Sequence, residues 1–158
     1  MTELKIYDDT MREEIKGFFS KCFSALGWKY ETDGRHADTV NIRTVYMCDG
    51  GCFWCLFDDG KLVGTVALRT VDKVKKTVEL KRLYVLEETQ GRGFGDLLFK
   101  TCIDYAKEQG FKRIYSDTRK DRFASQHLMR KYGFEEISKY NENPHAELYF
   151  MLDFQQGK

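Results

Sequence analysis

The chain has 158 residues, of which 42% are hydrophobic and 32% are charged. This length and apolar content predict one compact domain over residues 1–158 and exclude an intrinsically disordered chain. Lys and Arg number 26 and Asp and Glu number 25, so the net charge of +1 provides no overall field that would attract nucleic acid or an anionic membrane. Seven of the basic residues fall between positions 69 and 92, which fits either solvated strand ends or a site for a phosphorylated ligand.

The N-terminal sequence and the cysteines indicate a cytoplasmic protein. The opening residues, MTELKIYDDTMREE, contain no apolar core of a signal peptide, and no window approaches the ~18 uninterrupted apolar residues that a membrane span needs. Five cysteines are an odd number, and four of them lie in apolar runs, which is typical of reduced thiols.

The first periodic signal follows Thr10, which has the spacing of a capping box with Glu13. Apolar residues then recur at helical spacing from Met11 to Phe23, which predicts an amphipathic helix with one buried face. An irregular, polar connection is expected over residues 28–38.

Strands and two further helices are expected in the rest of the chain. The Asp-Gly dipeptide within 58–61 is typical of a tight hairpin, and glycines at 110 and 133 are expected to end the helices. The expected elements are strands at 52–57, 62–68 and 77–86, a helix with apolar positions from 94 to 106, a strand at 113–117, a helix capped by Asp121, and strands at 134–138 and 147–152. The order β-α-β-β-β-α-β-α-β-β predicts a mixed α/β fold with a strand–helix–strand crossover in its middle.

A glycine-rich segment lies between the strand at 77–86 and the following helix. Its sequence is Gln90-Gly91-Arg92-Gly93-Phe94-Gly95. Glycines let several backbone N–H groups turn toward one point, and the helix N-terminus adds free N–H groups and a positive dipole end. The physics favours an anion, most plausibly a pyrophosphate, over a simple tight turn. Asp96-Leu97 after Gly95 excludes a Walker A loop, and Asp96 also excludes a dinucleotide fingerprint.

This segment resembles the acetyl-CoA-binding core of the GNAT superfamily of N-acetyltransferases. The pattern Gln90-x-x-Gly93-x-Gly95, preceded by Glu79-Leu80-Lys81-Arg82-Leu83-Tyr84-Val85, matches the family motif at its strand-to-helix junction, and the resemblance extends over about residues 51–152. It implies a central, mixed and mostly antiparallel sheet that is splayed between the fourth and fifth strands and flanked by helices. It also implies acetyl-CoA as co-substrate and no metal.

The resemblance assigns the cofactor-binding residues one by one. The backbone of the glycine segment would hold the pyrophosphate, and the edge of the strand before it would pair with the pantetheine arm. The Leu83 N–H would donate to the acetyl carbonyl oxygen and stabilise the charge that develops there. The implied residues are Leu83, Tyr84, Val85, Gln90, Gly91, Arg92, Gly93, Phe94, Gly95 and Asp96.

Catalysis also needs a group that deprotonates the amine, because a free primary amine is mostly protonated near pH 7. Glu79 is our candidate base, since some members of the superfamily place a catalytic glutamate 11 residues before the position of Gln90. The alternative is a structural glutamate that pairs with a neighbour such as Lys81 or Arg82.

The family's usual proton donor to the departing thiolate is a tyrosine, and its position here is Met129, which cannot donate a proton. Tyr132, Tyr84, His127 and water are the alternatives. The position of a family asparagine is Arg122, which is either a cofactor contact or a solvated residue.

Cys48, Cys52 and Cys55 have the C-x3-C-x2-C spacing of a radical S-adenosylmethionine cluster loop. The short chain and the following hairpin argue against a cluster, and we expect the thiols to pack in the core.

The sequence therefore predicts an acetyl-CoA-dependent N-acetyltransferase that acts by direct attack in a ternary complex. Its acceptor is expected to be a small-molecule amine, with the loop 140–144 either lining the acceptor pocket or forming an ordinary hairpin loop. The alternative is a non-catalytic acyl-CoA-binding or regulatory module. A monomer and a homodimer are both open.

Overall fold

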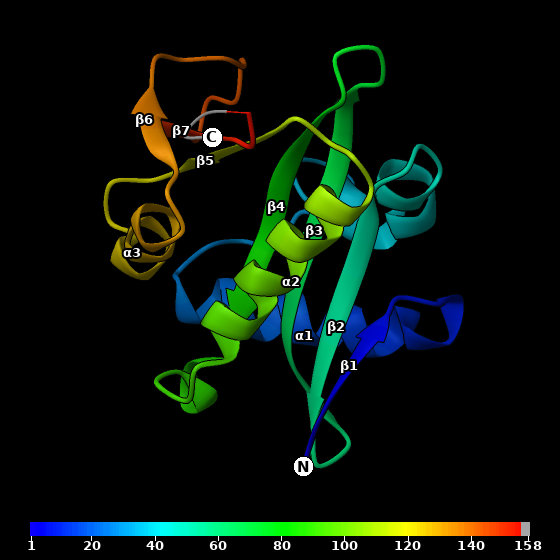
Figure 1. Ribbon diagram of the computed structural model, residues 1–158. Coiled ribbons are helices and arrows are strands. Elements are labelled where there is room, and N and C mark those ends of the chain that lie inside the picture. The colour runs from blue at the N-terminus through cyan, green and yellow to red at the C-terminus, as the bar shows by residue number, and fades with distance from the viewer. Residues whose placement is uncertain (156–158) are drawn as a thin grey trace.

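The computed structural model describes residues 1–155, which form one seven-stranded sheet with three helices (Figure 1). The strand order is β1-β2-β3-β4-β5-β7-β6, and β4 and β5 are the parallel pair among antiparallel neighbours. The elements are β1 (Thr2–Ile6), α1 (Arg12–Ala25), β2 (Cys52–Asp58), β3 (Lys61–Asp72), β4 (Thr77–Val85), α2 (Phe94–Glu108), β5 (Arg113–Thr118), α3 (Phe123–Lys131), β6 (Glu135–Ile137) and β7 (Leu148–Asp153).

This order confirms the fold class and the element sequence predicted from hydrophobic periodicity. The β2–β3 hairpin turns through Asp59 and Gly60, whose φ angles of 49° and 81° are both positive, as a type I′ turn requires. Within residues 1–155 no helix is long and apolar enough to cross a membrane.

The two long helices cover opposite faces of the sheet (Figure 1). The buried face of α1 carries Ile15, Phe19 and Phe23, each fully shielded from solvent. On the other face, α2 packs closely on β3 because Gly64 lacks a side chain. A Cβ at Gly64 would lie only 2.8 Å from Leu98 Cδ1.

The predicted helix caps were wrong at two positions. Thr10 does not cap α1, because Asp8 instead accepts from the Thr10 N–H at 2.8 Å and caps a short 3₁₀ turn, η1 (Asp9–Met11). Asp121 does not cap α3, whose N-cap is Arg122, without a side-chain hydrogen bond.

The connection predicted to be irregular over residues 28–38 is irregular as far as residue 36, and the chain between there and β2 is more ordered. It contains a 3₁₀ turn, η2 (Ala37–Val40), and a single π-helical turn, η3 (Arg43–Met47). Tyr46 in this segment is 2% exposed, so the connection forms part of the core.

Candidate functional site

The central feature of the site is the divergence of β4 and β5. The two strands pair only over Thr77–Arg113, Val78–Ile114 and Glu79–Tyr115, although both continue further. Beyond this point β5 pairs only with β7, and Figure 1 shows the β5–β7–β6 part of the sheet turned away from β1–β4. The backbone edge of β4 is therefore open on the side that faces β5.

A β-bulge in β4 lies within this opening. Ala67 pairs with Lys81 and Thr65 with Tyr84, so two residues of β4, Arg82 and Leu83, face one residue of β3. Arg82 adopts a φ of 55°, in the left-handed region that non-glycine residues rarely adopt. A bulge interrupts the regular ladder and re-aims the backbone groups beside it.

The Arg82 side chain holds this unusual backbone in place. Its guanidinium donates two hydrogen bonds to the Asp38 carboxylate, at 2.7 and 2.8 Å, and a third to the Arg35 carbonyl at 3.1 Å. Asp38 also accepts from the Tyr46 hydroxyl. Although burial opposes ionisation, the hydrogen bonds and the positive charge of Arg82 hold the pKa of Asp38 below its ordinary value.

The glycine segment folds as the sequence predicted, into a turn that leads directly into α2. Gly91 and Gly93 have φ angles of 86° and 83°, and Gly93 is the N-cap of α2 without a side-chain cap. In the described chain, none of the N–H groups of residues 91–96 donates a hydrogen bond to another residue. The first bond into the turn comes from Leu97, which donates to the Gly93 carbonyl at 3.1 Å.

Three side chains of this segment are engaged with the protein. Arg92 forms an ion pair with Asp58 at 2.9 Å, Gln90 donates to the Val85 carbonyl at 3.2 Å, and Asp96 accepts from Lys131 and Tyr132. The Arg92 contact leaves the backbone as the segment's main source of donors toward a ligand.

Two adjoining cavities occupy the opening. The first, here called the loop cavity, has a volume of about 520 Å³ and lies between β4, the glycine segment and the start of α3. Of the predicted cofactor residues, it is lined by Leu83, Tyr84, Val85, Gln90, Gly91, Gly93, Phe94 and Gly95, and not by Arg92 or Asp96.

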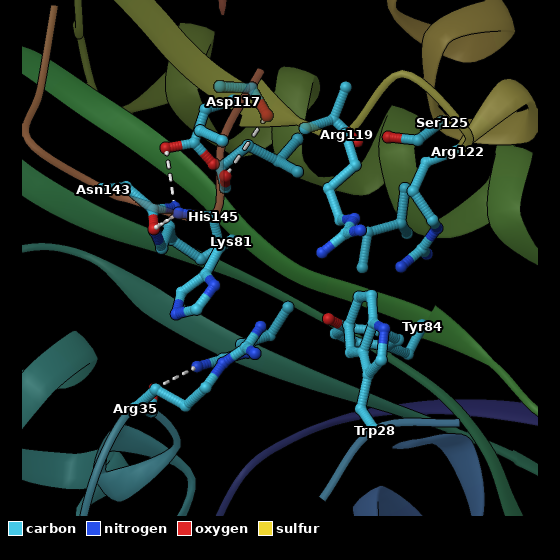
Figure 2. A pocket seen from close by; sticks show the side chains of 16 residues that line it. Trp28, Arg35, Lys81, Tyr84, Asp117, Arg119, Arg122, Ser125, Asn143 and His145 are labelled. Carbon is cyan, nitrogen blue, oxygen red and sulfur yellow. Dashed lines mark hydrogen bonds between the residues drawn. The ribbon is translucent and has the colours of Figure 1, made fainter. Parts of the chain in front are cut away.

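The second cavity, here called the strand cavity, has a volume of about 220 Å³ and lies between residues 80–84 of β4 and residues 116–119 at the end of β5 (Figure 2). Leu83, Tyr84, Arg122 and Ser125 line both cavities, so the two spaces meet at the bulge. Asn143, from the loop 140–144, also lines the strand cavity.

Glu79 lies beneath this region and lines neither cavity. Its carboxylate, which is 1% exposed, accepts from Arg69 at 2.8 Å, from the Tyr140 hydroxyl at 2.5 Å and from Asn141 at 3.2 Å. Burial raises the pKa of Glu79, but Lys81, at 3.8 Å, and the hydrogen-bond donors outweigh it, so that the net shift is downward. The closest ion pair of Glu79 is therefore with Arg69, at 2.8 Å, and not with Lys81.

The candidate proton donors lie at different places. Tyr132 donates to Asp96 at 2.7 Å, and His127 is exposed on α3, whereas Met129, at the position of the family's tyrosine, is buried. Burial and the hydrogen bond to Asp96 raise the pKa of Tyr132 to about 12. Tyr84 is the tyrosine that lines both cavities in the part of the chain that the structure describes.

The cysteine motif does not assemble into a metal site in the described residues. Cys52 and Cys55 are buried in β2, and Cys48 is exposed before it, donating to the Thr44 carbonyl. No group of three or more His, Cys, Asp or Glu side chains within residues 1–155 is arranged to hold a metal.

The sheet splays between β4 and β5 beside a glycine turn at a helix N-terminus, which is the arrangement that the sequence resemblance implied. The model of the acetyltransferase (GNAT) family matches residues 9–134, and the chain belongs to this family.

Similar proteins include N-acetyltransferase 8B of Homo sapiens, 29% identical over 70% of this chain and 51% of that protein, and the probable N-acetyltransferase camello of Xenopus tropicalis, 30% identical over 62% of this chain and 45% of that protein. The chain thus spans about half the length of these curated relatives. A GNAT acetyltransferase from Staphylococcus aureus Mu50 has the same fold, with a TM-score of 0.85, 24% identity and coverage of 97% of this chain and 99% of the other.

The sequence alone did not reveal most of the strand cavity. Trp28 and Arg35 lie in the connection expected to be irregular, and Arg119 and His145 lie in loops after β5 and before β7. The available signal was positional, because Asp117 and Arg119 stand at the carboxyl end of a strand beside a crossover, where α/β folds place ligands.

Proposed function

We propose that this protein transfers the acetyl group of acetyl-CoA to a primary amine of a small molecule by direct attack in a ternary complex. The single observation that carries the proposal is the row of backbone N–H groups over residues 91–96. They have no acceptor in the described chain, and four of the residues, Gly91, Gly93, Phe94 and Gly95, line the loop cavity. Free N–H groups at a helix N-terminus match the charge and geometry of a pyrophosphate.

The chain fits the rest of acetyl-CoA as well. The open edge of β4 beside Leu83 and Val85 offers main-chain groups to an extended amide chain such as pantetheine. Leu83 lies at the junction of the two cavities, within the bulge. Its N–H is our candidate for stabilising the negative charge that develops on the acetyl carbonyl oxygen when an amine attacks from the strand cavity.

Direct attack is supported by the state of the nearest thiol. Among residues 1–155, Cys22 is the cysteine that lines either cavity. Burial raises its pKa to about 12, so the thiol is protonated near pH 7 and is a poor nucleophile. This supports the amine of the acceptor, rather than a cysteine, as the nucleophile.

The assignment of Glu79 as the base stays a prediction. Both carboxylate oxygens accept hydrogen bonds, from Arg69, Tyr140 and Asn141, and this supports the alternative of a structural glutamate. In that role Glu79 would pair with Arg69 and hold the loop 140–144 in position. The Glu79→Gln variant separates the two roles. Loss of the acidic limb of the pH profile of kcat indicates a base, whereas an unchanged profile with a lower thermal midpoint indicates positioning.

The glycine segment provides the sharpest test of the proposal. Gly95→Pro removes one of the free N–H groups without breaking an intrahelical hydrogen bond, because it lies in the first turn of α2. Gly95→Ala retains the N–H, and its Cβ would lie 3.5 Å from Leu128, an ordinary contact. We expect the proline variant to bind CoA about 10- to 100-fold more weakly by calorimetry, as loss of a charge-assisted hydrogen bond predicts, with little change in the alanine variant.

Thiol release from acetyl-CoA with a panel of amines tests turnover. Amine-dependent release supports the transferase. Saturable CoA binding without release across the panel supports the non-catalytic acyl-CoA-binding module instead, and equal CoA affinities of the two Gly95 variants contradict the assigned binding site.

A further inference from the structure

We propose that the acceptor amine carries a second, negatively charged group, a carboxylate or a phosphoryl group, that binds to Arg35, Arg119 and Arg122 in the strand cavity. This inference rests on the proposed function and specifies the substrate class of the same site. It follows from the charges that line the cavity and from the partners that those charges lack.

The strand cavity is strongly unbalanced in charge. Within the described chain it is lined by five cationic side chains and by a single carboxylate, Asp117. That carboxylate already accepts from Asn141 at 2.7 Å and from Asn143 at 3.3 Å. The cationic residues are Arg35, Lys81, Arg82, Arg119 and Arg122.

Two of these cations are compensated by the protein. Arg82 is paired with Asp38 on two hydrogen bonds, and Lys81 Nζ lies 3.8 Å from a carboxylate oxygen of Glu79. Arg82 and Lys81 therefore have largely buried counter-ions and belong to the framework of the site. Arg119 Nε also lies within ion-pair distance of a carboxylate, 3.6 Å from the exposed Asp121, whereas Arg35 and Arg122 have no such partner in the described chain. These three arginines remain to be accounted for.

The three remaining arginines gather around one aromatic ring (Figure 2). Their guanidinium carbons lie 5.2, 5.5 and 6.0 Å from the centre of the Trp28 ring for Arg35, Arg119 and Arg122, respectively. Arg122 also lies 5.1 Å from the Tyr84 ring, beside the junction with the loop cavity. Arg35 is far in the sequence from Arg119 and Arg122, so the fold has brought like charges together.

No residue of the described chain accepts a hydrogen bond from these three guanidinium groups. Arg119 Nε is buried and without a hydrogen-bond partner, since its nearest carboxylate oxygen, on Asp121, is 3.6 Å away. A buried polar group without a partner destabilises the empty site, and clustered like charges add to that effect. An anionic group of the ligand would satisfy both deficits, and guanidinium groups match carboxylate and phosphoryl oxygens in geometry.

The position of the cluster agrees with a role in acceptor recognition. The cluster borders the strand cavity, which opens next to Leu83. The CoA phosphates are expected to bind elsewhere, at the glycine segment of the loop cavity. Arg122 lines both cavities and is available to either substrate, whereas Arg35 and Arg119 line only the strand cavity. Substitutions of Arg35 and Arg119 therefore distinguish an effect on acceptor binding from an effect on CoA binding.

Matched pairs of amines test the inference. L-Aspartate is compared with L-asparaginamide, and O-phosphoethanolamine with ethanolamine, by kcat/KM at constant ionic strength. We expect the anionic member of at least one pair to be preferred by about tenfold or more, and the pair concerned identifies the carboxylate or the phosphoryl group. Removing the negative charge also lowers the pKa of the amine, which favours attack by the neutral member, so the comparison is conservative.

Two variants locate the effect. Arg119→Gln and Arg35→Gln are expected to lower kcat/KM for the preferred anionic amine by about 10- to 100-fold and for its neutral partner by less than about twofold. The dissociation constant of acetyl-CoA is expected to stay unchanged. Arg130→Gln is the control, because Arg130 lines neither cavity and pairs with Glu136 at 3.4 Å on the surface.

Equal or better use of the neutral members overturns the inference, and so does an equal loss for all amines in the two variants. Should no amine be acetylated, binding of O-phosphoethanolamine and of L-aspartate to the CoA-loaded protein is measured by calorimetry. Saturable binding that is lost in Arg119→Gln supports the anion site and contradicts only the proposed transfer, whereas absence of binding of both probes overturns the anion site.

Discussion

The ion pair between Asp38 and Arg82 gives the strongest link between the stability of the fold and the geometry of the site. Asp38→Asn keeps the size of the side chain and removes its charge. The Arg82 side chain is 14% exposed and that of Asp38 is 18% exposed, so the guanidinium would be left largely buried without a counter-ion. Because the Arg82 backbone occupies the left-handed region, the same change also removes the main support of the bulge.

Breaking a buried ion pair by removing one partner costs about 3–5 kcal/mol. The partial exposure of both side chains places this pair at the lower end, so we expect the free energy of unfolding to fall by about 3 kcal/mol. In a chain of this size such a loss corresponds to a decrease in Tm of roughly 6–12 °C. The Asp104→Asn control breaks an exposed pair with Lys100 at 2.7 Å and is expected to cost about 0.5 kcal/mol or less.

The pH dependence has a definite sign. The pKa of Asp38 is lowered in the folded state, so its contribution to stability is complete above the unfolded pKa of about 4 and is lost as the pH falls through the folded value. Urea unfolding curves of the wild type and Asp38→Asn should therefore be well separated at pH 7 and converge in strong acid. The turnover of the folded variant should also fall, because Leu83 follows Arg82 in the bulge.

Two results would refute this reasoning. A loss of less than about 1 kcal/mol at pH 7, similar to the Asp104→Asn control, would show that the pair contributes little net stability. An unchanged kcat in a clearly destabilised variant would show that the pair does not control the position of Leu83.

The remaining predictions concern a close backbone approach and a buried imidazole. Gly51→Ala would place a Cβ 2.1 Å from the Leu68 carbonyl oxygen and 2.4 Å from that of Tyr46, so we expect the free energy of unfolding in urea to fall by more than about 3 kcal/mol. Gly17→Ala, in an open helical position, should instead stabilise the protein by up to about 1 kcal/mol. Equal effects of the two substitutions would contradict the close packing at Gly51. Burial and the positive charges nearby lower the pKa of His36 from 6.5 to about 4, so its neutral form contributes roughly 3 kcal/mol that is present above pH 6.5 and lost as the pH falls toward 4. His36→Asn should flatten this part of the pH–stability curve, and an identical slope in both proteins would rule out the assignment.

The order of helices and strands could be predicted from the sequence because its signals are local. Apolar residues at helical spacing identified α1 and α2, and the Asp-Gly turn identified the β2–β3 hairpin. The glycine segment could be recognised equally well, since two of its glycines, Gly91 and Gly93, adopt positive φ angles that other residues avoid. Its function as a source of backbone N–H donors depends on the local sequence alone and on no side chain from another segment.

The strand cavity could not be predicted in the same way, because its side chains come from distant segments that meet only after folding. No local pattern places Trp28 beside Arg119, and none indicates that Arg82 leaves the regular strand conformation. The wrong helix caps have a related cause. Asp8 competes with Thr10 for the same N-terminal turn, and the spacing rule does not decide between them.

The arginines of the strand cavity show why burial and charge must be considered together with partners. Arg82 has its counter-ion and three hydrogen bonds, so it stabilises the bulge whether or not a substrate is present. Arg119 lies on the same cavity without a hydrogen-bond acceptor for its buried Nε. The first arrangement lowers the free energy of the empty protein, whereas the second lowers it only when a ligand supplies the missing oxygen atoms. Arginine thus stabilises the protein framework at position 82, whereas at position 119 it is available to bind the anionic group that we propose for the acceptor.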